Sequence, residues 1–408
     1  MIRFVALFSF ISFVFPIAAA ERIDMYSAAV QVQTQQEADR NAAFTDALKQ
    51  VVVKITGDEE SLDNPELEPV LAKSRSYVSG FSYQRNSLYS GQPESNGEER
   101  DPSADASSAV FAQSLPEKEY ILKVQFSDDA LLQQIRDIGL PVWGALRPSI
   151  IAWIVMQENG ERHLVNSDYP ALNMSLAREA ERAGLPIFLP VGDLQDLSSV
   201  NLNELWGLFP SSVSEASQRY PNDYRLLGRV YQADEGLELK WTLLMGSIAK
   251  TGGAKSVDYP SLWRQMTSVV AQQLAEQFAV VSDPTADAQE LRILVSGIDQ
   301  FIEYASLVEH VERLSSVEHV SVRQVYQDKV NLGIKLRGSR ANFEQQVALA
   351  GKLQLVAPPF SQETELSSAQ PPAEREDASL TQDDQFAAVE LNEMPQSLNF
   401  YWVPDGGA

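Results

Sequence analysis

The chain contains no cysteine in 408 residues and only three histidines. The absence of cysteine excludes disulfides, thiolate nucleophiles, thiolate metal sites and a lipid attached to an N-terminal cysteine. His163, His310 and His319 occur neither in an H-E-x-x-H motif nor at i, i+4 spacing, so a zinc site is not expected. Core packing alone must hold the fold together, and a chain of this length has room for two or three domains.

Basic residues are few relative to acidic ones. The chain has 32 Lys and Arg against 56 Asp and Glu, a formal net charge of −24. Such a surface repels phosphate backbones, so nucleic acid is not an expected partner. The imbalance is large near the end of the sequence, where residues 361–408 include the single basic residue Arg375. We interpret the acidic balance mainly as a source of solubility.

Motifs that mark catalysis or cofactor binding are also missing. The sequence has neither a G-x-S-x-G nucleophile motif nor a G-x-G-x-x-G dinucleotide motif. The stretch GGAKS at 252–256 lacks the adjacent Gly-Lys of a phosphate-binding loop, and we predict a hairpin turn or loop there. We therefore expect no metal and no cofactor.

A long apolar run occurs only in the first part of the sequence. Arg3 precedes this run, and Ala18-x-Ala20 precedes the polar Glu21. The arrangement predicts a secretory signal peptide over residues 1–20, cleaved after Ala20, with a retained membrane anchor as the alternative. We expect a periplasmic mature chain without an integral membrane span, because no later run has the required length.

Hydrophobic periodicity predicts three small domains of α/β and α+β class. Residues 21–140 show the order β-α-α-β-β-α, with a long amphipathic helix that Gly57 ends. Residues 147–283 contain two continuous apolar runs around a helix, which is typical of a parallel βαβ unit within a mixed sheet. Residues 290–357 follow the order β-α-β-β-α-β, the ferredoxin-like or split-βαβ arrangement.

Two segments have no apolar period. Residues 86–116 form a long loop within the first domain, and residues 358–397 follow the third domain as an acidic linker or tail. Both are rich in Ser, Pro and acidic residues, and the loop is also rich in Gly. Such segments bury too little apolar surface to offset the entropy of ordering. We predict that both are disordered.

The segment 398–404 is different, because it alternates large apolar side chains. Phe400 and Trp402 lie on one face of the predicted strand, and Tyr401 lies on the other. Leaving these side chains in water costs free energy, so we expect the strand to bind something. It either returns to an open sheet edge of its own chain, which we favour, or it is displayed for a partner.

Two carboxylates, Asp193 and Asp196, directly follow the apolar run 185–191. Ligands in open α/β sheets bind at the carboxyl ends of strands, and two carboxylates can act as acid and base when burial separates their pKa values. The alternative is that they cap the next helix. We favour capping and keep both residues as possible ligand or partner contacts.

Several motifs together resemble a known family. They are Tyr26-x3-Val30-x-Val32, RPSIIAWIV at 147–155, AREAERAGLPIFLPVGDLQDL at 177–197, WGLF at 206–209 and ASQRYPNDYRLLGRV at 216–230. Over residues 23 to about 250 the chain resembles a proteobacterial exported family with the domain of unknown function 2066. The resemblance implies a Gram-negative cell-envelope protein and brings no established activity.

These observations favour one functional hypothesis and leave two open. The first is a non-catalytic periplasmic interaction or assembly protein of the cell envelope, with another envelope protein as its partner. The second is a periplasmic hydrolase that uses carboxylates near Asp193. The third is a small-ligand or cation-binding protein that uses a cleft between the first two domains.

Overall fold

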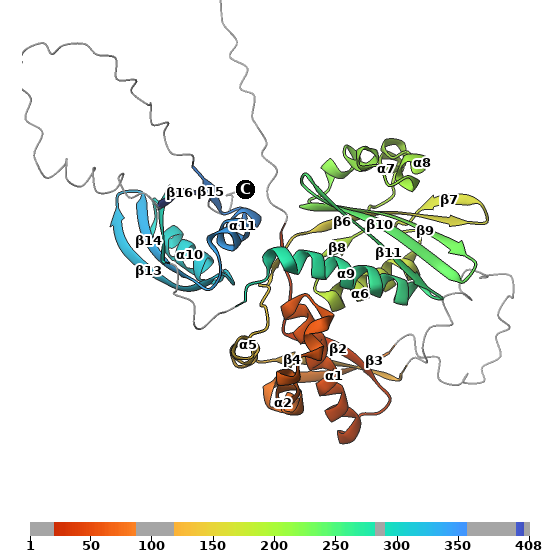
Figure 1. Cartoon of the computed structure of the whole chain (residues 1–408), viewed down its shortest axis with the longest axis horizontal. Coiled ribbons are helices and arrows are strands. Elements are labelled where there is room, and N and C mark those ends of the chain that lie inside the picture. The colour runs from red at the N-terminus through yellow and green to blue at the C-terminus, as the bar shows by residue number, and fades with distance from the viewer. Residues whose placement is uncertain (1–19, 87–117, 282–289, 357–396, 404–408) are drawn as a thin grey trace, which may run out of the picture.

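The computed structural model describes residues 20–86, 118–281, 290–356 and 397–403 (Figure 1). The predicted signal peptide and nearly all of the two predicted disordered segments lie outside these residues. Within the described ranges, no helix is both long and apolar enough to cross a membrane. The chain has a mixed α/β architecture with several separate sheets, as the periodicity predicts.

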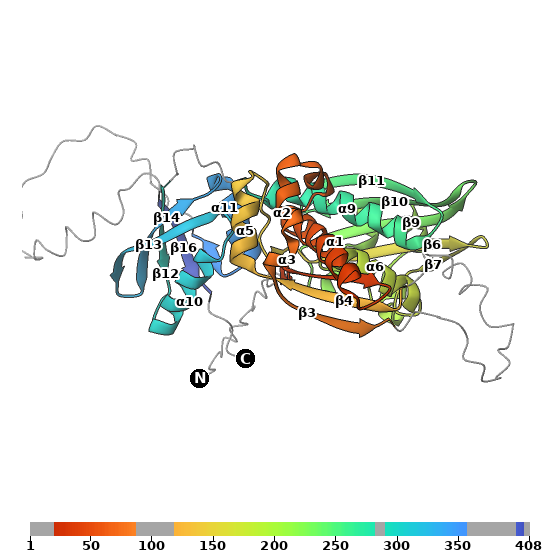
Figure 2. The same ribbon diagram turned by 90° about the horizontal axis from the view of Figure 1, so that it is seen from below.

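The first unit is a three-stranded antiparallel sheet covered by a long helix (Figure 2). Its main elements are β2 (Ser27–Val32), α1 (Glu37–Thr56), β3 (Val78–Arg85), β4 (Tyr120–Phe126) and α5 (Asp128–Asp137). The strand order is β2-β4-β3. Between α1 and β3, two 3₁₀ turns, Glu59–Asp63 and Pro65–Leu67, precede the short helices α2 (Glu68–Ala72) and α3 (Ser74–Tyr77). The sequence predicts one helix there.

A glycine ends α1 where the first two units meet. Gly57 has φ of 74°, and a Cβ at this position would lie 2.6 Å from Ala275 Cβ and 2.8 Å from the Trp143 ring. Trp143 is buried, and the guanidinium of the fully buried Arg147 lies 3.5 Å from its ring centroid. Arg147 lies in β5 (Leu146–Arg147), which pairs with β1 (Glu21–Arg22). The junction therefore depends on close packing around one tryptophan.

The second unit is a six-stranded mixed sheet. Its strands are β6 (Ile150–Glu158), β7 (Glu161–Leu164), β8 (Ile187–Phe188), β9 (Tyr224–Ala233), β10 (Gly236–Met245) and β11 (Ile248–Ser256). The order is β11-β10-β9-β6-β7, with β8 beside β6. β6 is parallel to both β8 and β9, so the parallel βαβ unit that the sequence predicts is present.

Helices cover both faces of this sheet (Figure 1). α6 (Pro170–Ala183) and α9 (Tyr259–Phe278) pack on one face, where Ile150 and Ile154 are buried. α7 (Leu194–Ser199), α8 (Leu202–Trp206) and two 3₁₀ turns, Pro210–Val213 and Ala216–Arg219, cover part of the other face. Alternate β6 residues therefore face two separate cores, which is why this strand is apolar from Ile150 to Met156.

The prediction of a turn or loop at 252–256 is wrong, because these residues lie in β11. This strand pairs with β10 along its whole length. Gly252 pairs with Trp241, and a Cβ on Gly252 would lie 2.2 Å from the Trp241 ring. Gly252 therefore makes room for a large buried side chain on the neighbouring strand, and a pattern typical of turns forms an edge strand instead.

The third unit is a five-stranded sheet at one end of the molecule (Figures 1 and 2). Its elements are β12 (Glu290–Ser296), α10 (Phe301–Glu312), β13 (Val317–Tyr326), β14 (Lys329–Leu336), α11 (Arg340–Ala350), β15 (Leu353–Leu355) and β16 (Ser397–Trp402). The predicted order β-α-β-β-α-β is present, and β16 adds a fifth strand to it. The strand order is β13-β14-β12-β16-β15.

The C-terminal strand returns to its own chain, but not to an open edge as we expected. β16 lies inside the sheet, parallel to β12 and antiparallel to β15. In a split-βαβ sheet the first and last strands pair directly, whereas here β16 separates them. An interior strand pairs along both of its edges, so β16 hydrogen-bonds to β12 and to β15 while Leu398, Phe400 and Trp402 enter the core.

Candidate functional site

Asp193 is the N-cap of α7. Its Oδ1 accepts a hydrogen bond from the Asp196 backbone N–H at 3.0 Å. Arg219 donates to both carboxylate oxygens, from Nη1 to Oδ1 at 2.7 Å and from Nη2 to Oδ2 at 2.8 Å. The hydrogen bonds from Arg219 and from the Asp196 backbone lower the pKa of Asp193 to about 2. A carboxyl group that holds its proton this weakly is a poor general acid near neutral pH.

Asp196 is fully buried, and hydrogen bonds occupy both of its carboxylate oxygens. Oδ2 accepts from the Gly192 N–H at 2.8 Å and from the Tyr220 hydroxyl at 2.5 Å. Oδ1 lies 3.1 Å from Arg219 Nη1. Burial and the bond to Asp196 raise the pKa of Tyr220. The two predicted carboxylates are thus brought together, but as a brace that fixes α7 to the chain around Arg219.

The loop that precedes α7 is held as firmly as the helix. The Tyr220 hydroxyl accepts from the Val191 N–H at 3.0 Å, and Ser167 Oγ donates to the Val191 carbonyl at 3.0 Å. Gly192 has φ of +78°, and a Cβ there would lie 2.0 Å from Asn166 Nδ2. Only glycine fits such a position without a shift of its neighbours. The backbone at the start of α7 is therefore a rigid platform.

This platform presents apolar side chains to solvent. Val191 is 54% exposed, Leu194 83% and Leu197 51%. Leu194 and Leu197 are three residues apart in α7 and so lie on one side of the helix. We call these three residues the α7 surface. Among the residues of this segment only the two carboxylates were predicted as contacts, although an apolar i, i+3 pair directly after a helix cap was a usable signal.

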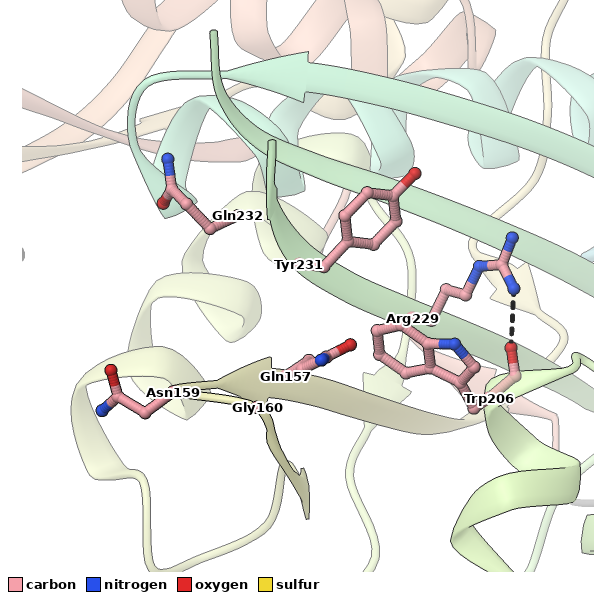
Figure 3. Close-up of a pocket in the computed structure, with 7 residues that line it drawn as sticks. All are labelled: Gln157, Asn159, Gly160, Trp206, Arg229, Tyr231 and Gln232. Atoms are coloured by element: carbon pink, nitrogen blue, oxygen red, sulfur yellow. Dashed lines mark hydrogen bonds between the residues drawn. The ribbon is translucent and has the colours of Figure 1, made fainter. Parts of the chain in front are cut away.

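A hollow of about 420 Å³ lies near the far end of the same helical layer (Figure 3). Its lining residues are Gln157, Asn159, Gly160, Trp206, Arg229, Tyr231 and Gln232. Gln157 and Tyr231 are paired across the parallel strands β6 and β9 and therefore stand side by side. Asn159 and Gly160, both with positive φ, form the turn between β6 and β7. We call this hollow the Trp206 pocket.

Trp206 is fixed at the end of α8 by cationic and aromatic neighbours. Arg229 Nη1 donates to the Trp206 carbonyl at 2.9 Å, and its guanidinium lies 5.7 Å from the ring centroid. The Arg162 guanidinium lies 4.4 Å from the same ring and donates to Asn203 Oδ1 at 2.6 Å. The Tyr231 and Trp206 rings are 5.9 Å apart. Figure 3 shows the Gln157 amide extending toward Trp206.

The lining of the Trp206 pocket suits binding and not acid–base chemistry. It consists of three amides, two aromatic rings, a guanidinium and a glycine, with no carboxylate or imidazole among them. Glu238 lies next to the pocket, where it pairs with Tyr231 across β9 and β10. Burial raises its pKa, but hydrogen bonds from Tyr231 and Lys240 and the charge of Lys255 outweigh burial and hold the pKa below its usual value.

A second hollow, of about 290 Å³, lies where the first two units meet. Strand β2 and helix α1 form one wall, and α6 and α9 form the other. Some of its charged side chains are already bound within the chain. Arg264 Nε lies 2.9 Å from Glu179 Oε2, and Lys54 Nζ donates to the Ser27 carbonyl at 2.9 Å. A hollow is thus present between the first two domains, where the third hypothesis expects a cleft that binds a small ligand or a cation. Its Glu179 carboxylate is already paired with Arg264.

The predicted C-terminal contact residues divide between the two faces of β16. Phe400 and Trp402 are 2% and 3% exposed and belong to the core of the third unit, together with Leu398. Tyr401 is 49% exposed, and its ring packs over Gly297, where a Cβ would approach it to 2.8 Å. Phe400 and Trp402 therefore contact the chain's own core, and only Tyr401 is open to solvent.

None of the three histidines is among the lining residues of the two hollows. His163 Nε2 is 3.8 Å from Glu161 Oε2 on the β6–β7 hairpin. His310 lies on α10, where its ring packs edge-on against Trp402 with centroids 5.9 Å apart. Within the described residues, no group of three or more His, Cys, Asp and Glu side chains is placed to hold a metal ion.

Comparison with known proteins corrects the expected resemblance. Residues 19–144 match the model of a domain of unknown function, DUF8605. This is a different domain from the domain of unknown function 2066, so the expected resemblance to that family is wrong. The match covers the first unit only, whereas most of the motifs behind the expectation lie between 147 and 230. Short strand and turn motifs of this kind reflect local structure and did not identify the family.

Two solved structures show weak similarity, and no curated protein matches the chain. A competence or damage-inducible protein from Enterobacter asburiae is 11% identical, and the match covers 36% of this chain and 92% of that one, with a TM-score of 0.19. TolB from Acinetobacter baumannii is 18% identical over 38% of this chain and 34% of its own, also with a TM-score of 0.19. We draw nothing about fold or function from either. Over residues 19–144 the chain is therefore similar to one domain family of unknown function.

Proposed function

We propose that the protein is a non-catalytic interaction protein of the periplasm that binds a partner protein through the α7 surface. One observation carries the proposal: Leu194 is 83% exposed on a helix whose backbone is fixed by a fully buried carboxylate. Exposed apolar side chains on a soluble surface mark contact sites when they are grouped. A surface that is already rigid loses little conformational entropy when a partner binds.

The same geometry argues against the hydrolase hypothesis. A carboxylate pair needs one member that gives or takes a proton near neutral pH. Asp193 has a pKa of about 2, and both Asp196 oxygens are occupied by donors from the chain itself. The periplasmic location belongs to the proposal and rests on the signal-peptide pattern before Glu21.

Site-specific photo-crosslinking in intact cells tests the proposal. A photoreactive amino acid at Leu194 is expected to give a discrete adduct with one envelope protein. The matched control is Glu276, an exposed position on α9, which covers the opposite face of the sheet. The proposal fails if Leu194 gives no adduct, or if Glu276 gives the same adduct with the same yield.

A further inference from the structure

We infer that the Trp206 pocket is a binding site for a neutral saccharide. The inference concerns a different surface from the α7 surface and does not depend on the proposed protein partner. The hollow of about 420 Å³ falls within the range of small-molecule sites, roughly 300–1,000 Å³. Its aromatic and amide side chains fit a sugar ring, which has apolar C–H faces and hydroxyl groups at its edge.

The aromatic part of the pocket offers a surface for a sugar ring. Trp206 and Tyr231 come from α8 and β9, and their ring centroids are 5.9 Å apart with planes inclined by 55°. Arg162 lies 4.4 Å from the Trp206 ring centroid and limits movement of the indole. Rings held in this way pack against the C–H face of a pyranose without losing side-chain freedom, because that freedom is already lost.

The polar part of the pocket matches hydroxyl groups. Gln157, Asn159 and Gln232 each carry an amide that both donates and accepts hydrogen bonds. A sugar hydroxyl also does both, so it can pair with either end of an amide. Figure 3 shows Gln157 beside the rings and Asn159 and Gln232 at the opposite end of the pocket. One ligand can therefore contact the aromatic rings at one end and the amides of Asn159 and Gln232 at the other.

Arg229 adds donor capacity that the described residues leave unused. Its Nη1 donates to the Trp206 carbonyl, and its Nε is buried without a hydrogen-bond partner in the described part of the chain. A guanidinium has five N–H donors, and the bond to the Trp206 carbonyl uses one of them. Because Arg229 lines the pocket, its other donors can bind a ligand hydroxyl.

Three other classes of ligand fit less well. An extended peptide binds by adding a strand to a free sheet edge. The pocket floor has no such edge, because β6 pairs with β7 and β9, and β9 pairs in turn with β10. An anionic ligand would meet one lining cation, which already donates to Trp206, on a chain with net charge −24. A cation would find no carboxylate among the lining residues.

Isothermal titration calorimetry on the full chain tests the inference. The probes are a β-1,4-linked N-acetylglucosamine trimer, an α-1,4-linked glucose trimer and, as a peptide, trialanine. We expect at least one saccharide to bind at a single site. Trp206→Ala is expected to weaken that binding at least tenfold, and Gln157→Ala, which leaves α8 intact, is expected to weaken it as well. Phe301→Ala removes an aromatic ring on α10, outside the pocket and 82% exposed, and serves as the control with unchanged binding.

Three results would overturn the inference: no heat from either saccharide at millimolar concentration, saccharide binding that both pocket variants leave unchanged, or tighter binding of trialanine than of both saccharides. None of these bears on the adduct from Leu194, so the saccharide site and the proposed protein contact fail independently. Thermal unfolding midpoints within 2 °C of the unchanged chain, a margin of roughly 0.5–1 kcal/mol, identify variants that have kept their fold.

Discussion

Removal of β16 is expected to unfold the third unit. The strand buries Leu398, Phe400 and Trp402 in the core, each less than a tenth exposed. Burial of a large apolar side chain stabilises by about 1.5–3 kcal/mol, so together the three contribute roughly 5–9 kcal/mol. This is comparable to the whole stability of a typical domain, about 5–15 kcal/mol. The deletion also leaves the facing edges of β12 and β15 without their hydrogen-bond partner.

The assay is differential scanning calorimetry of two purified chains, one ending at residue 396 and a control ending at residue 403. The control lacks only the residues after β16 and is expected to unfold like the full chain. The shorter chain is expected to lose one transition or to have it lowered by more than 10 °C. A synthetic peptide of residues 395–404 is expected to restore that transition. Equal unfolding profiles for the two chains would refute the role of β16 in the core.

Two further predictions concern the α7 platform and His310. Gly192 has φ of +78°, and the Cβ of Gly192→Ala would lie 2.0 Å from Asn166, so this variant is expected to destabilise the second unit by about 2 kcal/mol or more in urea unfolding. Gly139→Ala is the control, because Gly139 has φ of +72° but open space around it, and it is expected to cost about 1 kcal/mol. Equal costs for the two variants would contradict the packing argument. Burial and the nearby charges of Lys352, Arg22 and Arg313 lower the pKa of His310 to about 4, below the usual 6.5. The unfolded chain therefore binds more protons between those values, and the stability of the third unit is expected to fall as pH decreases from 6.5 to 4. His310→Gln is expected to flatten this dependence, and an unchanged pH profile in His310→Gln would contradict the assignment.

Hydrophobic periodicity predicted the long elements because each has one dominant environment. Helix α1 has a single buried side and an αL glycine directly after it, so both its length and its end could be predicted. Strand β6 faces two cores and is apolar at successive positions, which indicates a buried strand. In both cases local sequence and tertiary packing favour the same structure.

The missed elements depend on contacts that the sequence does not display. Strand β7 is only four residues long, although the Asn159-Gly160 turn before it is a strong hairpin signal that could have been used. Strand β11 carries a glycine at 252 because the Trp241 ring of the neighbouring strand occupies the space that a Cβ would fill. The interior position of β16 depends on its pairing with both β12 and β15. The residues 398–404 alone do not indicate which strands they pair with.

The candidate site was predicted in part. The sequence identified Asp193 and Asp196 and the favoured capping role, and the structure has the cap. It could not identify Arg219 and Tyr220, which complete the brace from more than twenty residues away. The Trp206 pocket joins α8, the β6–β7 turn and β9, and only the pairing of β6 with β9 brings them together.

The most direct measurement of the central claim compares two exposed apolar positions. Leu194→Glu changes the α7 surface, and Val257→Glu changes an apolar residue of similar exposure after β11. Each variant and the unchanged chain are expressed in cells, and the fraction that co-elutes with a partner protein from a gently prepared envelope extract is measured by size-exclusion chromatography. The account predicts that Leu194→Glu loses the complex and that Val257→Glu keeps it. Equal co-elution of the two variants would contradict the claim that α7 is the contact surface.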